Sequence, residues 1–240
     1  MTLLTLTGVK KRFSNGVDAL SGLSFEVREG EFVSLLGPSG CGKSTALRLI
    51  ADLIAPDLGT ITWRGVRPEL GFVFQEPTLM PWADALRNAR LPLDLKKTPR
   101  SGSETGAARA LVRLGLEDFL HTYPRQLSGG MKMRVSIARA LAAGPRLLLM
   151  DEPFAALDEP TRQRLNDDLL ALSREDGITV IFVTHSVMEA TYLSDRVLVM
   201  SSRPGRVKSE IILPKGPRDR LSHAFAENQA QVAAALAVAA

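Results

Sequence analysis

Residues 37–44 read Gly37-Pro38-Ser39-Gly40-Cys41-Gly42-Lys43-Ser44, and this stretch predicts the fold of the whole 240-residue chain. It has the form G-x-x-x-x-G-K-S, the pattern of a loop that binds phosphate groups. The apolar run at 32–36 precedes it and predicts a buried strand, and apolar residues follow it at helical spacing from Ala46 to Ile50. Strand, glycine loop and helix together form the context that this motif requires.

The glycines and the following helix make this loop suitable for an anion. Gly40 and Gly42 let the backbone curl without a Cβ atom in the way, so that successive N–H groups point into the curl at the positive end of the helix dipole. We expect Lys43 to reach the β- and γ-phosphates of a nucleotide, and the Ser44 hydroxyl to bind Mg²⁺. The predicted nucleotide-binding residues of this loop are Gly37, Pro38, Ser39, Gly40, Cys41, Gly42, Lys43, Ser44 and Thr45.

Composition narrows the class of protein. The chain is 45% hydrophobic, enough for a large core, and its net charge of +4 comes from cations interspersed with acids. Such dispersed charge indicates a solvated surface rather than a nucleic-acid-binding patch. One cysteine excludes an internal disulfide framework and fits a reducing compartment. We expect no secretory leader, and no apolar run reaches the roughly 20 residues that span a bilayer, so a membrane function would need another chain.

A pair of acids follows a second apolar run. Residues 147–150 predict a parallel strand buried on both faces, and Asp151-Glu152 comes directly after it. Two acids at such a position are costly unless they hold a cation or a proton. We therefore expect Asp151 to hold Mg²⁺ through water and Glu152 to polarise the attacking water. The alternative is a strand-end turn with two solvated acids.

Two further polar residues follow predicted strands. Gln75 comes after the run 70–74, where an amide can bind Mg²⁺ or orient a water, although an ordinary loop glutamine is the default interpretation. His185 follows the buried run at 178–183 and Thr184, at the edge where Lys43 is expected. It is a candidate sensor of the γ-phosphate.

Two more positions are candidate contacts to a nucleotide. Ser128 is a good N-cap for a helix that ends near Gly144, and the N–H groups of Ser128, Gly129 and Gly130 form a second possible anion site. The alternative there is a simple cap and turn. Phe13 lies in a basic, polar stretch where an adenine ring could stack on it, and the alternative is an ordinary packing residue.

The remaining chain predicts an inserted subdomain and a tail. Residues 83–126 have helical periodicity, broken by prolines and a glycine, and the polar run at 96–105 predicts a mobile loop. We expect an α/β domain over 1–215 that contains a helical subdomain at about 83–143. Residues 216–240 form an alanine-rich tail, expected to be helical but without a readable function.

Taken together and in this order, the motifs resemble those of the nucleotide-binding subunits of ATP-binding cassette (ABC) transporters over about residues 3–215. The resemblance implies a phosphate-loop NTPase core of ABC type with an antiparallel β-subdomain and an inserted helical subdomain. Residues 37–44 match the Walker A loop, Leu127–Met131 the signature and Leu147–Glu152 the Walker B strand. The shorter matches are Phe13 for the adenine loop, Gln75 for the Q-loop, Ala156-Leu157-Asp158 for the D-loop and His185 for the switch histidine.

The resemblance also implies a mechanism and partners. Two copies of the chain would face each other head to tail, and each ATP would lie between the Walker A loop of one copy and Ser128–Gly130 of the other. Ser44, Gln75 and Asp151 would hold Mg²⁺. The roles assigned to catalytic residues are general base for Glu152, γ-phosphate contacts for His185 and Lys43, and orientation of Mg²⁺ and water for Gln75. Asp158 would contact the nucleotide through the D-loop.

Three short stretches narrow the resemblance to importers of nitrate, sulfonates and taurine; they are Leu127–Met131, Asp151–Asp158 and Met80-Pro81-Trp82. Met131 stands where the family usually has Gln. It cannot donate a side-chain hydrogen bond, but backbone donation from the motif survives, so we expect activity to be kept.

The implied protein is an ATP hydrolase coupled to transmembrane transport. It would work on the cytoplasmic face of the inner membrane, with membrane permeases and an extracytoplasmic solute-binding protein. The surface after Gln75, including Trp82, would receive a permease helix, and the alternative for Trp82 is core packing. The open alternatives for function are an exporter or lipid-trafficking ATPase, an importer of thiamine-precursor pyrimidines, and a cassette ATPase that acts on nucleic acid or ribosomes.

Overall fold

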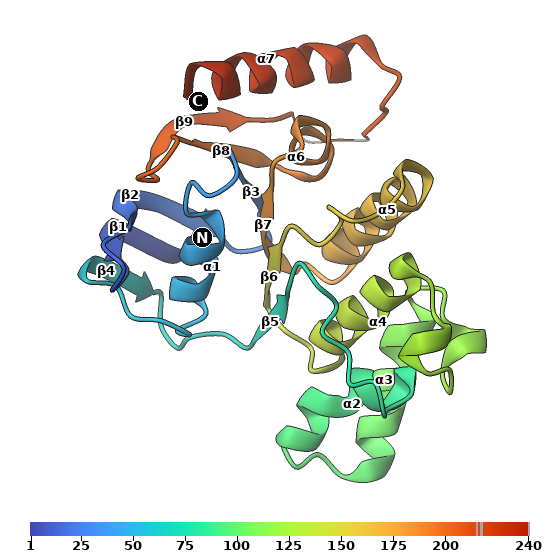
Figure 1. Cartoon of the computed structure of the whole chain (residues 1–240). Coiled ribbons are helices and arrows are strands. Elements are labelled where there is room, and N and C mark those ends of the chain that lie inside the picture. The colour runs from blue at the N-terminus through green and yellow to red at the C-terminus, as the bar shows by residue number, and fades with distance from the viewer. Residues whose placement is uncertain (215, 217, 240) are drawn as a thin grey trace. The chain divides into compact units, whose positions relative to one another are not determined.

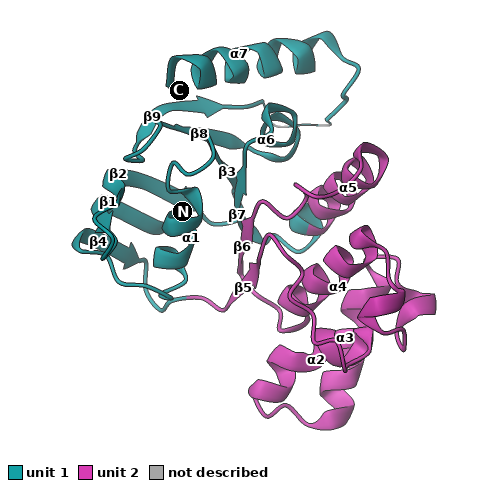
Figure 2. Ribbon diagram, in the orientation of Figure 1, with its two compact units in different colours: residues 1–67, 173–240 teal, residues 68–172 magenta. Residues whose placement is uncertain are grey.

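The computed structural model describes residues 1–214, 216 and 218–239, and these form an α/β fold with mixed strand directions (Figure 1). The predicted fold class is confirmed. The chain divides into two compact units (Figure 2). Unit 1 comprises residues 1–67 and 173–240, and unit 2 comprises residues 68–172. The predicted boundary between domain and tail, at residue 215, lies outside the described residues.

Unit 1 contains an antiparallel sheet in the order β2-β1-β4. Its strands are β1 (Thr2–Arg12), β2 (Asp18–Arg28) and β4 (Leu58–Trp63). Apolar residues alternate along β2, and Leu23, Phe25 and Val27 are all buried. This alternation is what a sheet with one buried face requires.

The other strands of unit 1 carry the glycine loop. β3 (Phe32–Leu36) lies between β7 (Thr179–Thr184) and β8 (Arg196–Met200) and is parallel to both, and β9 (Val207–Ile212) runs antiparallel to β8. Every residue of β3, β7 and β8 is buried, which explains why their sequences are mostly apolar. Helices α1 (Lys43–Ile50), α6 (Val187–Leu193) and α7 (His223–Ala239) complete the unit.

The alanine-rich tail forms α7, which belongs to the core of unit 1. Val232 and Ala239 lie in one buried cluster with Leu36, the last residue of β3, and with Ala190 of α6. Val187 of α6 packs against the same cluster. The tail therefore packs on β3, which precedes the glycine loop, and on α6, which follows His185.

Unit 2 combines two parallel strands with a group of helices. The strands are β5 (Leu70–Val73) and β6 (Leu147–Asp151). The helices are α2 (Ala85–Leu95), α3 (Arg100–Val112), α4 (Gly129–Ala142) and α5 (Glu159–Glu175), with 3-10 turns at Glu117–Phe119 and Pro124–Gln126. The last three residues of α5 are counted with unit 1. α2, α3 and α4 pack on one another, and Leu111, Leu114 and Leu116 are buried.

The prediction of a mobile loop at 96–105 is wrong for most of this stretch, because α3 begins at Arg100. Pro99 stands before the first turn, where a proline costs no helical hydrogen bond. Glu104 accepts from Arg100 Nε at 2.9 Å, one helical turn away, and from Arg90 Nη1 of α2 at 2.9 Å. These ion pairs support a helix in this polar sequence. Pro92, expected to break a helix, lies inside α2.

Candidate functional site

The glycine loop of unit 1 connects β3 to α1 in the predicted order of strand, loop and helix. Lys43 is the first residue of α1 and is 3% exposed. Its Nζ donates to the carbonyl oxygens of Gly37 at 2.8 Å and Pro38 at 3.0 Å, so the side chain folds back across the loop. Gly42 precedes the helix and offers no capping side chain, which leaves the first-turn N–H groups suited to an anion.

Two of the glycines in this loop are required by their surroundings. Gly42 has φ 104°, and a Cβ atom there would lie 2.6 Å from the carbonyl oxygen of Ala19. A Cβ atom at Gly37 would lie 3.0 Å from Cys41 Sγ and 3.1 Å from Met200 O. The loop is therefore shaped by β2 and β8 as well as by its own sequence.

His185 follows β7 at the edge of unit 1 where the glycine loop also lies. Leu36, which precedes the loop, is paired with Thr184, which precedes His185. The His185 side chain is exposed, and the turn below it is fixed because Thr184 Oγ1 accepts from Ser186 N at 2.9 Å and donates to the buried Glu189 at 2.5 Å. Phe13 follows β1 and is 36% exposed, so its ring is available for stacking.

In unit 2, Gln75, Asp151 and Glu152 lie at the carboxyl ends of the paired strands β5 and β6. Val73 is paired with Met150, so Gln75 and Asp151 each lie within two residues of the paired strand ends. Asp151 is 6% exposed. Glu152 has φ 45°, a left-handed conformation that costs roughly 1–3 kcal/mol for a residue other than glycine and is often found at functional sites.

The signature and D-loop segments lie at the starts of two helices in unit 2. Ser128 is the N-cap of α4, as predicted, and its hydroxyl accepts from Met131 N at 3.2 Å. Ser128 and Gly129 are exposed, whereas Gly130 is buried, and its Cβ would lie 2.5 Å from Thr161 Cγ2. Asp158 accepts from Thr161 N at 3.3 Å. Hydrogen bonds from Thr161 lower the pKa of Asp158, which keeps it ionised at the start of α5.

Three arginines that the sequence analysis missed each donate to backbone carbonyls of one predicted functional loop. Arg203 donates to Gly40 in the glycine loop, at 3.0 Å. Arg139 donates to Pro77 and Thr78 after Gln75, both at 2.9 Å, and Arg162 donates to Phe154 and Leu157 before Asp158. Burial lowers the pKa of Arg139, but a guanidinium stays charged at neutral pH. No local pattern marks these arginines, since two of them act on loops at least 61 residues away in sequence.

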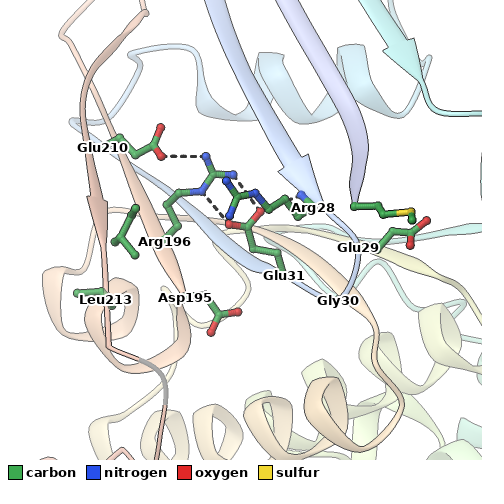
Figure 3. A pocket seen from close by; sticks show the side chains of 10 residues that line it. Arg28, Glu29, Gly30, Glu31, Asp195, Arg196, Glu210 and Leu213 are labelled. Carbon is green, nitrogen blue, oxygen red and sulfur yellow. Dashed lines mark hydrogen bonds and ion pairs between the residues drawn. The ribbon is translucent and has the colours of Figure 1, made fainter.

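A pocket of about 290 Å³ lies at the other edge of the unit 1 strands, where β3 and β8 begin (Figure 3). The side chain of Arg196 is 9% exposed and donates to Glu31 at 2.8 and 2.9 Å and to Glu210 at 3.1 Å. Burial alone would lower the pKa of Arg196, but the hydrogen bonds and charges of Glu31 and Glu210 outweigh it and raise the pKa. This edge is an internally satisfied ion-pair network.

Residues 20–155, more than half of the chain, match the ABC transporter family. The chain belongs to this family. As an ABC transporter ATPase, it binds and hydrolyses ATP, and its hydrolysis is coupled to transport. None of the described helices has the length and apolar character needed to cross a membrane.

Individual relatives agree with the narrower resemblance. An aliphatic sulfonates import ATP-binding protein, SsuB 1 of Pseudomonas syringae pv. syringae, is 46% identical over 90% of this ABC chain and 89% of its own length. The taurine import ATP-binding protein TauB of Yersinia pestis is 41% identical over 90% of this chain and 86% of its own. The resemblance to sulfonate and taurine importers is thereby confirmed.

A solved structure matches the fold. The ATP-binding cassette MJ0796, in a dimeric post-hydrolysis state bound to ADP and Pi, has a TM-score of 0.80 and 35% identity, and the match covers 89% of this chain and all of that one.

Proposed function

We propose that this ABC ATPase powers the import of a small anion or organic solute of the sulfonate, taurine or nitrate type through a separate membrane permease. The observation that carries the proposal is the 46% identity to a sulfonate importer subunit along nearly the whole of both chains. It would act as a peripheral subunit at the cytoplasmic face of the inner membrane, together with an extracytoplasmic solute-binding protein.

Each unit carries one segment that we propose for phosphate binding, the glycine loop in unit 1 and Ser128–Gly130 in unit 2. We infer that the chain works as a head-to-tail dimer, which is supported by the dimeric state of the similar MJ0796 cassette. In this arrangement the phosphates of one ATP contact the glycine loop of one copy and Ser128–Gly130 of the other. Phe13 would stack on the adenine, and Asp158 would complete the contact between copies. The need for both copies explains why one chain carries two anion-binding segments.

The proposed metal ligands suit Mg²⁺ in their chemistry. Ser44, Gln75 and Asp151 offer a hydroxyl, an amide and a carboxylate oxygen, the hard donors that this ion prefers. When bound with ATP, Mg²⁺ neutralises part of the charge on the phosphates. The described residues contain no group of three or more His, Cys, Asp or Glu side chains that could hold a metal by themselves, so the nucleotide oxygens would complete the set.

The protein side chains divide the remaining work. Glu152 would accept a proton from the attacking water as general base, while Lys43 and His185 hold the γ-phosphate and Gln75 orients the water. Positioned charges of this kind account for most of the catalysis in phosphoryl transfer. The arginines on the three loops would keep these groups in place.

The permease would dock on the segment after Gln75. Trp82 is 73% exposed, which disfavours the alternative that it packs in the core. The segment is rigid because the buried Asn88 accepts from Met80 N at 2.8 Å and donates to Met80, Ala83 and Asp84 carbonyls. A fixed, exposed aromatic residue is a typical anchor of a protein interface.

Uptake measurements test the importer proposal. Cells that lack this chain would be compared with cells in which the wild type or Glu152→Gln is restored, using labelled taurine, alkanesulfonates, nitrate and a thiamine-precursor pyrimidine. We expect one uptake to be lost and to be recovered only by the wild type. No loss across the panel would leave the ATPase in place but reject the importer subfamily in favour of an exporter or another importer class.

A further inference from the structure

A turn between β8 and β9 carries an arginine to the back of the glycine loop. Arg203 lies in this turn, residues 201–206, and its Nε donates to the carbonyl oxygen of Gly40 at 3.0 Å. The guanidinium lies directly against Gly40, because a Cβ atom at that glycine would be 2.9 Å from Arg203 Nη2. We propose that Arg203 is a positioning residue that holds the glycine loop in its phosphate-binding conformation; the inference rests on the proposed use of that loop for nucleotide phosphates.

The turn itself is fixed, so that Arg203 is presented from a rigid support. Ser201 closes it with a backbone hydrogen bond to Arg206 O at 2.9 Å and a side-chain bond to Pro204 O at 3.1 Å. Gly205 N donates to Ala19 O at 2.9 Å, and a Cβ at Gly205 would lie 2.0 Å from Cys41 O. The turn thus packs against the loop backbone and is tied to the start of β2.

The hydrogen bond from Arg203 fixes the orientation of one peptide group. A trans peptide is planar, so its C=O and N–H bonds point in opposite directions. The carbonyl of Gly40 points outward to Arg203, and the N–H of the same peptide, on Cys41, points across the loop to Pro38 O at 3.3 Å. The Cys41 N–H thus closes a turn inside the loop, while the Gly40 carbonyl, which would repel a phosphate, is held toward Arg203.

Glycine makes this orientation easy to lose. Gly40 has φ 75°, and a glycine moves among left- and right-handed conformations with little steric cost, so the peptide that follows it can rotate. A donor outside the loop stabilises the orientation with the carbonyl outward. Arg203 therefore lowers the cost of preparing the loop for phosphate, and its loss should weaken nucleotide binding without removing any group that contacts the nucleotide.

Two substitutions of Arg203 with side chains of matched length separate the effect of its hydrogen bond from the effect of its charge. The Gln Nε2 atom is as many bonds from the backbone as Arg Nε, so Arg203→Gln keeps a donor at the same place without the charge. Arg203→Met has the same length and no donor. Arg206→Met, in the same turn, removes a positive charge from an exposed side chain and serves as the control.

Dissociation constants for ADP would be measured by titration of a fluorescent ADP analogue, with melting temperatures to verify folding. We expect Arg203→Met to weaken binding about 3- to 10-fold, the usual effect of one hydrogen bond, and Arg203→Gln and Arg206→Met to stay within about 2-fold of the wild type. In the Arg203→Met variant, the amide NMR resonance of Cys41 should shift or broaden in the nucleotide-free protein.

The outcomes separate failure of the inference about Arg203 from failure of the proposed phosphate site. Equal weakening in Arg203→Met and Arg203→Gln would show that charge rather than hydrogen bonding matters, and would overturn the inference. Unchanged affinity in Arg203→Met would also overturn it. Unchanged affinity in Lys43→Ala would instead overturn the proposed phosphate site on which the inference depends.

Discussion

The two ends of the parallel strands in unit 1 use buried cations in different ways. At the carboxyl end of β3, the Lys43 ammonium crosses a loop whose shape comes from glycines and whose donors are backbone N–H groups. At the amino end, the Arg196 guanidinium is enclosed by the carboxylates of Glu31 and Glu210 (Figure 3). The second end contains its own anions, whereas we propose that the first end receives an external anion. From this difference we expect Lys43 to serve ligand binding and Arg196 to serve stability.

The largest effect is expected at the amino end. Arg196→Met keeps much of the aliphatic stem but leaves Glu31 buried without its cation, which should lower the free energy of unfolding by about 3 kcal/mol. Urea unfolding measures this change, and Arg28→Met, at an exposed residue of the same pocket, is the control. The nucleotide affinity of the folded Arg196→Met variant should remain near that of the wild type. If Arg196→Met lost much of its nucleotide affinity and little of its stability, Arg196 would serve ligand binding rather than stability.

The complementary change is Lys43→Ala. Removing the cation that would pair with the β- and γ-phosphates should weaken ATP binding about 100-fold, as expected for the loss of charge-assisted hydrogen bonds. Equilibrium titration with ATP measures this effect. Its unfolding free energy should change less than that of Arg196→Met, because Lys43→Ala releases two neutral carbonyl oxygens, whereas Arg196→Met leaves a carboxylate without its cation. If Lys43→Ala binds ATP as tightly as the wild type, Lys43 does not serve ligand binding and the contrast with Arg196 fails.

A smaller effect is expected on the pH dependence of stability, at a second ion pair whose acid has a raised pKa. In unit 2, Arg134 Nη2 lies 3.0 Å from Asp168 Oδ2. Burial raises the pKa of Asp168 above its ordinary value of 3.8, although Arg134 opposes the shift. The folded state therefore binds this proton more tightly than the unfolded state. Its contribution to stability grows as pH falls through the raised pKa toward 3.8, and is least favourable at neutral pH.

Urea unfolding of the wild type and Asp168→Asn across this pH range measures that contribution. The difference in unfolding free energy, wild type minus variant, should increase as the pH is lowered. A difference that stays constant, or that increases toward neutral pH, would contradict the raised pKa.

Local patterns predicted much of the fold, and contacts between distant residues account for the errors. Gly37–Ser44, the apolar strands and the Ser128 cap follow from short-range rules, so the sequence alone locates them. Their assembly into one catalytic site remains a proposal. The helix at Arg100 was missed because its ion pairs include one from α2. Likewise, Arg203 reaches Gly40 across 163 residues, and no spacing rule predicts such a contact.

The most direct test of the account compares ATP binding and hydrolysis by the wild type and by Glu152→Gln. Glutamine has nearly the same shape as glutamate but cannot accept the proton of the attacking water. We predict that Glu152→Gln binds ATP with an affinity close to that of the wild type and hydrolyses it about 10²–10⁴-fold more slowly, the usual contribution of a general base. Hydrolysis by Glu152→Gln at a rate near that of the wild type would contradict the proposed role of Glu152 and the site built around it.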